Sequence, residues 1–224
     1  MITCLDTGRT FGETAAEQAT IVYGSTGAAA KEILSRDAGF EWVPSLAFLH
    51  ERHFRDRALL VYPPAPTSAE LGVAEALDAN GPPVSRAEAI EIVDLESAGG
   101  YGVFAVEPIA TGALIVEYAG LVAPATDGFD PYGLSYAETL AGEPLRLSAR
   151  RFGNAARFVN HDSAPNAEIT RVEHRGLLRV VIVATEDIAA REQVLVDYGE
   201  AYWRASGVEP QSLPRWLADY DVGS

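Results

Sequence analysis

Three stretches of the chain hold residues whose types and spacing could bind a ligand or carry out chemistry. The first is the glycine-rich turn Gly99 to Gly102, which leads directly into the apolar run Val103 to Ala105. Glycine permits a positive φ and lets a ligand approach the main chain closely. A phosphate or dinucleotide cradle would need a helix after the turn, and none is indicated. Alone, the stretch predicts only a turn before a strand.

The second stretch, residues 151–166, has the sequence RFGNAARFVNHDSAPN. Its side chains can make several directional hydrogen bonds at once, and Phe158 and Val159 would anchor it in a core. Burying it is costly unless its polar groups are paired. A polar loop in which Asn and Asp cap turns explains this stretch equally well when it is taken alone.

The third stretch, residues 187–203, contains a turn, the apolar run Val194 to Val196 and an aromatic ending that begins at Tyr198. A tyrosine that closes a strand usually packs at the edge of a core with its hydroxyl in water. No single stretch therefore establishes a function.

Together and in this order, the three stretches resemble the SET-domain family of lysine methyltransferases over about residues 86–203. The matching motifs are Gly100-Tyr101-Gly102-Val103-Phe104-Ala105, Ile109 to Gly112, Glu117-Tyr118-Ala119-Gly120, Gly153-Asn154, Arg157 to His161, Pro165-Asn166 and Asp197-Tyr198-Gly199. The resemblance implies a mainly β (α+β) fold of several small sheets. It also implies a pseudoknot, in which the segment ending at Tyr198 passes under the loop around Asn160.

The resemblance further implies a methyl transfer from S-adenosylmethionine to the side-chain amine of a lysine in a basic protein. Tyr198 would be the catalytic residue, with Tyr118 beside it. The residues expected to bind S-adenosylmethionine are Gly100, Tyr101, Gly102, Tyr132, Asn160, His161 and Trp203. Arg157 and Phe158 are expected to support the loop around Asn160.

The chain departs from the family pattern in three places. Asp162-Ser163 follows the Asn-His pair where many members have Ser-Cys, and the cysteine-rich zinc segment is missing. Since Cys4 is the single cysteine, no metal site is expected. Val196 stands where many members have an aromatic residue that sets the number of methyl groups added, so the product state is left open.

Two other functions were weighed against this one. A SET-like module that binds peptide or cofactor without turnover is the main alternative, although Asn160, His161 and Tyr198 are all present. A hydrolase that uses His161, Asp162 and Ser163 is disfavoured, because neighbours in a chain point apart and cannot form a catalytic triad.

The net charge of −15 favours a cationic partner and disfavours nucleic acid. Histone-like and ribosomal proteins are both basic enough to be substrates. The apolar runs are much shorter than the ~20 residues that span a bilayer, so no membrane association is expected. A cytoplasmic, or otherwise intracellular, soluble protein is predicted.

The secondary-structure elements that must position these residues divide the chain into a helical part and a part rich in strands. The boundary between the two parts is expected at Gly81 to Pro83. Residues 1–83 are predicted to be a helical N-terminal region of unknown role, with helices at 26–36 and 46–60. Thr67 and Glu70 form a capping-box pattern that would start a third helix through Leu77. Residues 84–204 form the predicted catalytic domain, with strands at 89–95, 102–106, 114–118, 177–184 and 194–198. Residues 205–224 form a predicted tail with a short helix at 214–219. Tyr202, Trp203, Trp216 and Tyr220 could form an aromatic lid over cofactor and lysine, and plain core packing explains them equally well.

Overall fold

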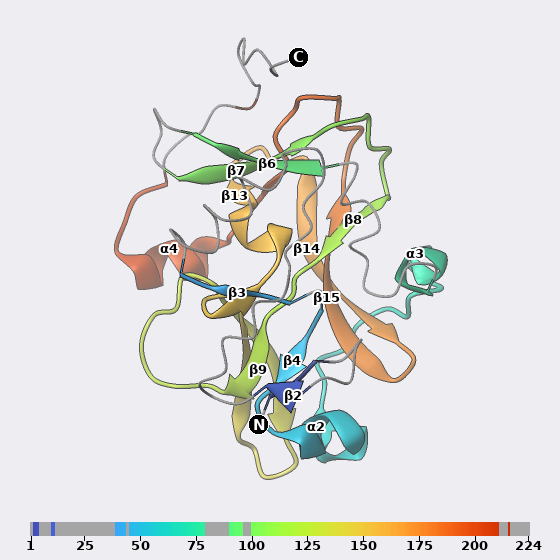
Figure 1. The fold of residues 1–224 in the computed structure, drawn as a ribbon, viewed down its shortest axis with the longest axis vertical. Helices are drawn as coiled ribbons and strands as arrows, with labels where there is room; N and C mark the ends of the chain where they lie inside the picture. The colour runs from blue at the N-terminus through green and yellow to red at the C-terminus, as the bar shows by residue number, and fades with distance from the viewer. Residues whose placement is uncertain are drawn as a thin grey trace.

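The computed structural model describes residues 2–4, 10–11, 39–43, 45–78, 90–95, 100–210 and 215. These residues form five sheets of short strands and only short helices (Figure 1). The predicted class, mainly β with several small sheets, is confirmed. No helix in the described ranges is long and apolar enough to cross a membrane.

A three-stranded sheet with the order β14-β15-β8 runs through the middle of the molecule (Figure 1). It contains β14 (Ala167–His174), β15 (Leu177–Ala184) and β8 (Leu114–Glu117). Every residue of β15 is buried. The main core covers one face of this strand, while the other face packs on a second apolar cluster that includes Leu77 of α3 (Ala74–Asp78). Because both faces are covered, the strand is apolar at every position except Arg179 instead of alternating between apolar and polar residues.

The largest sheet joins strands from both predicted domains. Its order is β2 (Thr10–Phe11), β1 (Ile2–Cys4), β4 (Ala47–Phe48), β9 (Leu121–Pro124), β11 (Pro144–Ser148), β10 (Gly133–Thr139) and β5 (Leu60–Val61). The strands that precede residue 83 therefore lie on both sides of β9, β11 and β10. The expected boundary at residues 81–83 itself lies outside the described residues.

Three two-stranded sheets complete the fold. The strands β6 (Ile90–Asp94) and β7 (Tyr101–Ala105) pair antiparallel, while β3 (Glu41–Trp42) and β12 (Phe152–Gly153) pair parallel. The third joins β13 (Asn160–His161) to β16 (Leu195–Val196) in parallel register. This last pairing is the predicted pseudoknot contact, because it brings the segment before Tyr198 against the loop around Asn160.

The prediction of one helix at 46–60 is wrong. This stretch contains β4, α2 (Glu51–Arg55), the 3₁₀ turn η1 (Arg57–Leu59) and the start of β5. Leu46, Ala47 and Phe48 are fully buried. Tertiary burial in the sheet therefore overrides their helix propensity. The helices expected at 26–36 and 214–219 lie outside the described residues.

The capping-box residues make their expected contacts but do not start a helix. The Thr67 amide donates to Glu70 Oε2 at 2.8 Å, and the Glu70 amide donates back to Thr67 Oγ1 at 3.3 Å. The helix α3 begins only at Ala74. A 3₁₀ turn, η3 (Ala155–Phe158), and an unexpected helix, α4 (Glu200–Ser206), complete the elements. Gly207, in the left-handed conformation with φ 67°, ends α4, as glycine commonly does at a helix C-terminus.

Candidate functional site

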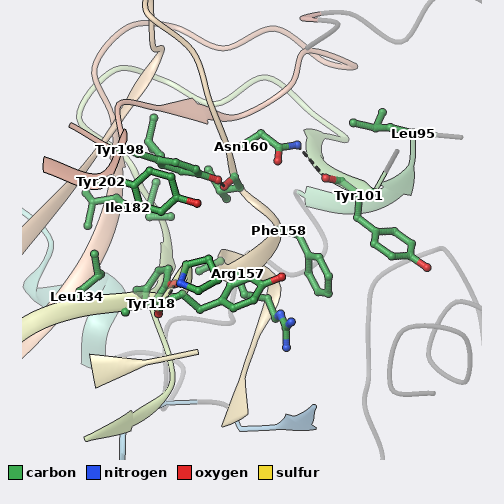
Figure 2. Close-up of a pocket in the computed structure, with 18 residues that line it drawn as sticks. Leu95, Tyr101, Tyr118, Leu134, Arg157, Phe158, Asn160, Ile182, Tyr198 and Tyr202 are labelled. Atoms are coloured by element: carbon green, nitrogen blue, oxygen red, sulfur yellow. Dashed lines mark hydrogen bonds between the residues drawn. The ribbon is translucent and has the colours of Figure 1, made fainter. Parts of the chain in front are cut away.

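The three chemically promising stretches meet around one cavity of about 530 Å³. Figure 2 shows Tyr198 and Tyr202 on one side of this space, Tyr118 and Arg157 across from them, and Asn160 beside Tyr101. A volume of this size is typical of a site for a small molecule or cofactor. The cavity is built by residues from β7, η3, the β13–β16 pair, α4 and the loop before β10.

Tyr198 follows β16 and is held at both ends. Its hydroxyl donates to the Val159 carbonyl at 2.8 Å, and its backbone amide donates to His161 Nδ1 at 3.1 Å. Burial raises the pKa of Tyr198, and the neighbouring Tyr202 and Tyr132 raise it further. The phenol is therefore neutral at physiological pH and points into the cavity as a fixed dipole.

Tyr118 comes from the end of β8 and lines the same cavity. Its hydroxyl donates to the Tyr132 carbonyl at 3.1 Å. Burial raises the pKa of Tyr118 above its ordinary value, and the nearby Tyr198 adds to this increase. The two predicted catalytic tyrosines thus lie close enough to interact, and both keep their protons.

A buried ion pair lies directly behind Tyr118. Arg179 makes a bidentate contact with Glu117, in which Nη2 donates to Oε2 at 2.6 Å and Nε donates to Oε1. Ser45 Oγ donates to Glu117 Oε2 at 2.7 Å, and Asn154 Nδ2 donates to the Glu117 carbonyl at 2.8 Å. Since Glu117 and Ser45 are fully buried, this network determines where the strand carrying Tyr118 lies.

Asn160 connects the pseudoknot to the glycine turn. Its Nδ2 donates to the Tyr101 carbonyl and to Gln193 Oε1, both at 2.8 Å. A Cβ added at Gly102 would lie 2.6 Å from Gln193 Oε1, so only glycine allows this approach. The amide of Asn160 therefore holds the turn at the edge of the cavity, as the dashed line in Figure 2 indicates.

The predicted cofactor residues separate into two groups in space. Gly100, Tyr101, Tyr132 and Asn160 line the cavity, whereas Gly102, His161 and Trp203 do not. The His161 ring packs against Trp203 with ring centroids 4.8 Å apart and accepts the Tyr198 amide through Nδ1. Its place is thus to support Tyr198. The Trp203 ring stacks on Tyr198 at 5.8 Å and an interplanar angle of 20°.

Sequence reasoning assigned Arg157 to loop support and placed Tyr202 only in a possible lid, but both line the cavity. The Arg157 guanidinium lies 4.1 Å from the Phe40 ring centroid and 4.4 Å from that of Tyr132. Its buried Nε has no hydrogen-bond partner in the described part of the chain. The family motif at 157–161 was the sequence feature that could have indicated Arg157 as a cavity residue.

Several apolar wall residues were missed altogether. They come from different elements and form no local pattern that could have identified them, and they include Leu95, Pro131, Leu134, Ile169 and Ile182. Elsewhere, the described residues contain no group of three or more His, Cys, Asp or Glu side chains able to hold a metal ion.

Comparisons with known proteins match part of this chain to one domain family. Residues 100–199 match the family model described as SET domain. The chain is 34% identical over 115 residues to the mouse histone-lysine N-methyltransferase EHMT1, covering 48% of this chain and 9% of the relative. It is also 34% identical over 118 residues to the Caenorhabditis elegans protein named "Probable histone-lysine N-methyltransferase set-23", covering 47% of this chain and 48% of that protein. The chain therefore spans less than half the length of these relatives.

A solved structure shows the same fold. The structure of ATXR5 in complex with histone H3.1 superposes with a TM-score of 0.56 at 19% identity, covering 75% of this chain and 85% of that one. At this identity the likeness concerns the fold alone.

The relatives also correct the predicted location. They are named as histone-lysine methyltransferases, and histones are nuclear proteins in the eukaryotes from which these relatives come. The cytoplasmic location expected from the sequence is therefore wrong.

Proposed function

We propose that the protein transfers a methyl group from S-adenosylmethionine to the side-chain amine of a lysine in a basic protein, because residues 100–199 match the SET-domain family model. One observation carries the proposal: a single cavity contains the Gly100–Tyr101 backbone and Asn160 at one end and the Tyr118 and Tyr198 phenols at the other. A site for a cofactor is thus continuous with a site for an amine.

The residues present fit S-adenosylmethionine. The cavity volume is adequate, and Asn160 fixes the Tyr101 main chain at the cavity wall. The buried Arg157 Nε, which has no hydrogen-bond partner among the residues that the structure describes, is a donor that a carboxylate could satisfy. When bound, this cofactor supplies an electrophilic methyl group on a sulfonium centre.

The tyrosine end of the cavity suits a neutral lysine amine. An amine must lose its proton before it can accept a methyl group, and its reference pKa is ~10.4. Burial among the rings of Tyr118, Tyr198 and Tyr202 disfavours the ammonium form and lowers the pKa of a bound lysine. The Tyr118 and Tyr198 oxygens, fixed by the Tyr132 and Val159 carbonyls, would orient the nitrogen lone pair toward the methyl donor.

Direct assay of methyl transfer tests this function. Purified protein is incubated with a histone-rich basic extract, a ribosomal protein extract and isotopically labelled S-adenosylmethionine, and lysine methylation is located by mass spectrometry. Labelled lysine in a basic protein supports the proposal. Cofactor binding without any labelled product in either extract would instead indicate the non-catalytic module.

Removing the amide of Asn160 should weaken cofactor binding. In Asn160→Ala the Tyr101 carbonyl and Gln193 Oε1 both lose their donor, so the glycine turn is no longer held at the cavity. We expect the Kd for S-adenosylhomocysteine, measured by calorimetry, to rise about tenfold or more, as for the loss of one or two buried hydrogen bonds. Asn166→Ala, which also disturbs the pseudoknot but lies outside the cavity lining, is the matched comparison. Equal effects of the two variants would contradict a direct role for Asn160.

The charge of −15 predicts that turnover depends on salt. Screening shortens the range of the protein's field to ~8 Å at 0.15 M salt. Steady-state kcat/KM on a basic protein should therefore fall as sodium chloride rises from low to physiological concentration, mainly through KM. A rate that does not respond to salt would mean that short-range pocket contacts alone select the substrate.

A further inference from the structure

We propose that residues 39–43 and 45–49 are a positioning segment for the catalytic cavity, acting through Phe40 on the cofactor-side wall and through Ser45 on Glu117, the last residue of β8, which precedes Tyr118. This inference rests on the proposed function. It gives part of the N-terminal region, for which the sequence indicated no role, a specific task at the site.

The segment is fixed to the SET domain by main-chain hydrogen bonds along its length. The Glu41 and Val43 amides donate to the Arg151 and Gly153 carbonyls at 2.7 and 2.8 Å, beside η3. Further along, the Ala47 amide donates to the Gly120 carbonyl at 2.8 Å, and β4 pairs with β9. The segment therefore passes from the η3 wall of the cavity to the residues that follow Tyr118.

Phe40 is the residue of this segment that contacts Arg157 in the cavity wall. Its buried ring lies in an edge-to-face contact with Phe158 at 5.7 Å, and the Arg157 guanidinium sits 4.1 Å from its centroid. The Tyr132 and Phe158 ring centroids lie 4.4 and 5.3 Å from the same guanidinium, so three rings contact the cation. Within the described ranges no carboxylate pairs with Arg157, and the guanidinium makes one long hydrogen bond, to the Arg150 carbonyl at 3.4 Å. Contacts with aromatic rings thus orient the Arg157 guanidinium, a charged group that lines the cavity.

Ser45 is the second point of action. It is fully buried, donates to Glu117 Oε2 at 2.7 Å and accepts from Arg179 Nη2 at 3.0 Å. The hydroxyl therefore closes the ion pair into a three-membered network. Glu117 is the residue immediately before Tyr118, so a change in the network is transmitted to the position of the Tyr118 hydroxyl.

The test at Phe40 compares two buried phenylalanines of the same segment. Phe40→Leu removes the ring under Arg157 while keeping an apolar side chain; Phe48→Leu makes the same change where the ring packs on Tyr136, outside the cavity. We expect Phe40→Leu to raise the Kd for S-adenosylhomocysteine by about five- to tenfold, in line with the loss of one buried cation–π contact. Phe48→Leu should leave that Kd within about twofold although it also lowers Tm. Equal Kd values for both variants, measured below their melting transitions, would overturn the assignment of Phe40.

The test at Ser45 is independent and uses turnover. Ser45→Ala should lower kcat by about tenfold and change the Kd for S-adenosylhomocysteine by less than about twofold, because it acts on Tyr118 and not on the cofactor end. Ser68→Ala is the control, since Ser68 is a buried serine whose hydroxyl contacts His174 Nδ1 at 2.8 Å, outside the cavity lining. If both serine variants lose the same fraction of kcat, or if Ser45→Ala retains the wild-type kcat, the positioning role of Ser45 is wrong.

The same measurements separate this inference from the proposed function. A wild-type protein that does not bind S-adenosylhomocysteine contradicts the function itself. A wild-type protein that binds it, together with unchanged Phe40→Leu affinity and unchanged Ser45→Ala turnover, contradicts only the positioning segment.

Discussion

Replacing Tyr198 with phenylalanine should lower the rate of methyl transfer by about a hundredfold or more. The change keeps the ring, which packs against Tyr202 at 4.7 Å and stacks on Trp203, and deletes only the hydroxyl. That hydroxyl is held 2.8 Å from the Val159 carbonyl at the amine end of the cavity. Loss of one preorganised group of this kind costs about 10²–10³ in turnover. Single-turnover kinetics with saturating cofactor would measure the effect on the chemical step.

Tyr136→Phe is a close control for this prediction. The Tyr136 hydroxyl also donates to a backbone carbonyl, that of Leu178, at 2.8 Å, and the side chain is fully buried. Tyr136→Phe loses this buried hydrogen bond and also the contact of the hydroxyl with Tyr62, so its decrease in Tm should be at least as large as that of Tyr198→Phe. Only Tyr198→Phe should lose activity, with cofactor affinity unchanged. A Tyr198→Phe rate within about threefold of wild type would show that this tyrosine only packs at the edge of the core.

The largest expected effect on stability comes from Arg179. Arg179→Met removes the bidentate partner of Glu117 and leaves a carboxylate in a fully buried site. Breaking a buried ion pair in this way typically costs about 3–5 kcal/mol. For a chain of this length each kcal/mol lowers Tm by about 2–4 °C, so a decrease of about 6–20 °C is expected. Thermal and denaturant unfolding of the wild type and the variant would measure it.

A second replacement tests the reason for the loss. The double variant Arg179→Met, Glu117→Gln has no unpaired buried carboxylate. Its free energy of unfolding should therefore be substantially higher than that of Arg179→Met alone. Arg204→Met, which breaks the exposed helical pair of Arg204 with Glu200, should change the free energy of unfolding by no more than about 0.5 kcal/mol. Equal losses for Arg179→Met and Arg204→Met would mean that the Glu117 pair contributes no more than a surface contact.

The sequence was sufficient to predict those features of the fold that depend on neighbouring residues. The mostly apolar, β-branched run at 177–184 predicted β15 with the same bounds, and the strand predicted at 102–106 is β7, which begins one residue earlier, at Tyr101. The order of the matched motifs indicated the fold and the Asn160–Tyr198 neighbourhood, which the pairing of β13 with β16 confirms. These features depend on residue type and on spacings of a few residues, which a sequence displays directly.

The helix expected at 46–60 shows where local reasoning stops. The helix propensity of Leu46 and Ala47 is a weak preference, and the pairing of Ala47 and Phe48 with β9 overrides it. The capping-box contacts of Thr67 and Glu70 form as expected, yet the chain after them makes a turn, because Val73 and Leu77 are needed to cover β15.

The sequence by itself determined the residue types of the site: the Asn160 amide, the Tyr118 and Tyr198 phenols and the glycine turn. Only the tertiary structure decided which of them share the cavity, since His161 and Trp203 instead support Tyr198 from behind. It also brought Ser45 to Glu117 and Arg179, contacts that join positions 72 and 134 residues apart. Such contacts leave no local pattern, because their partners are selected by the packing of the whole core and not by chain spacing.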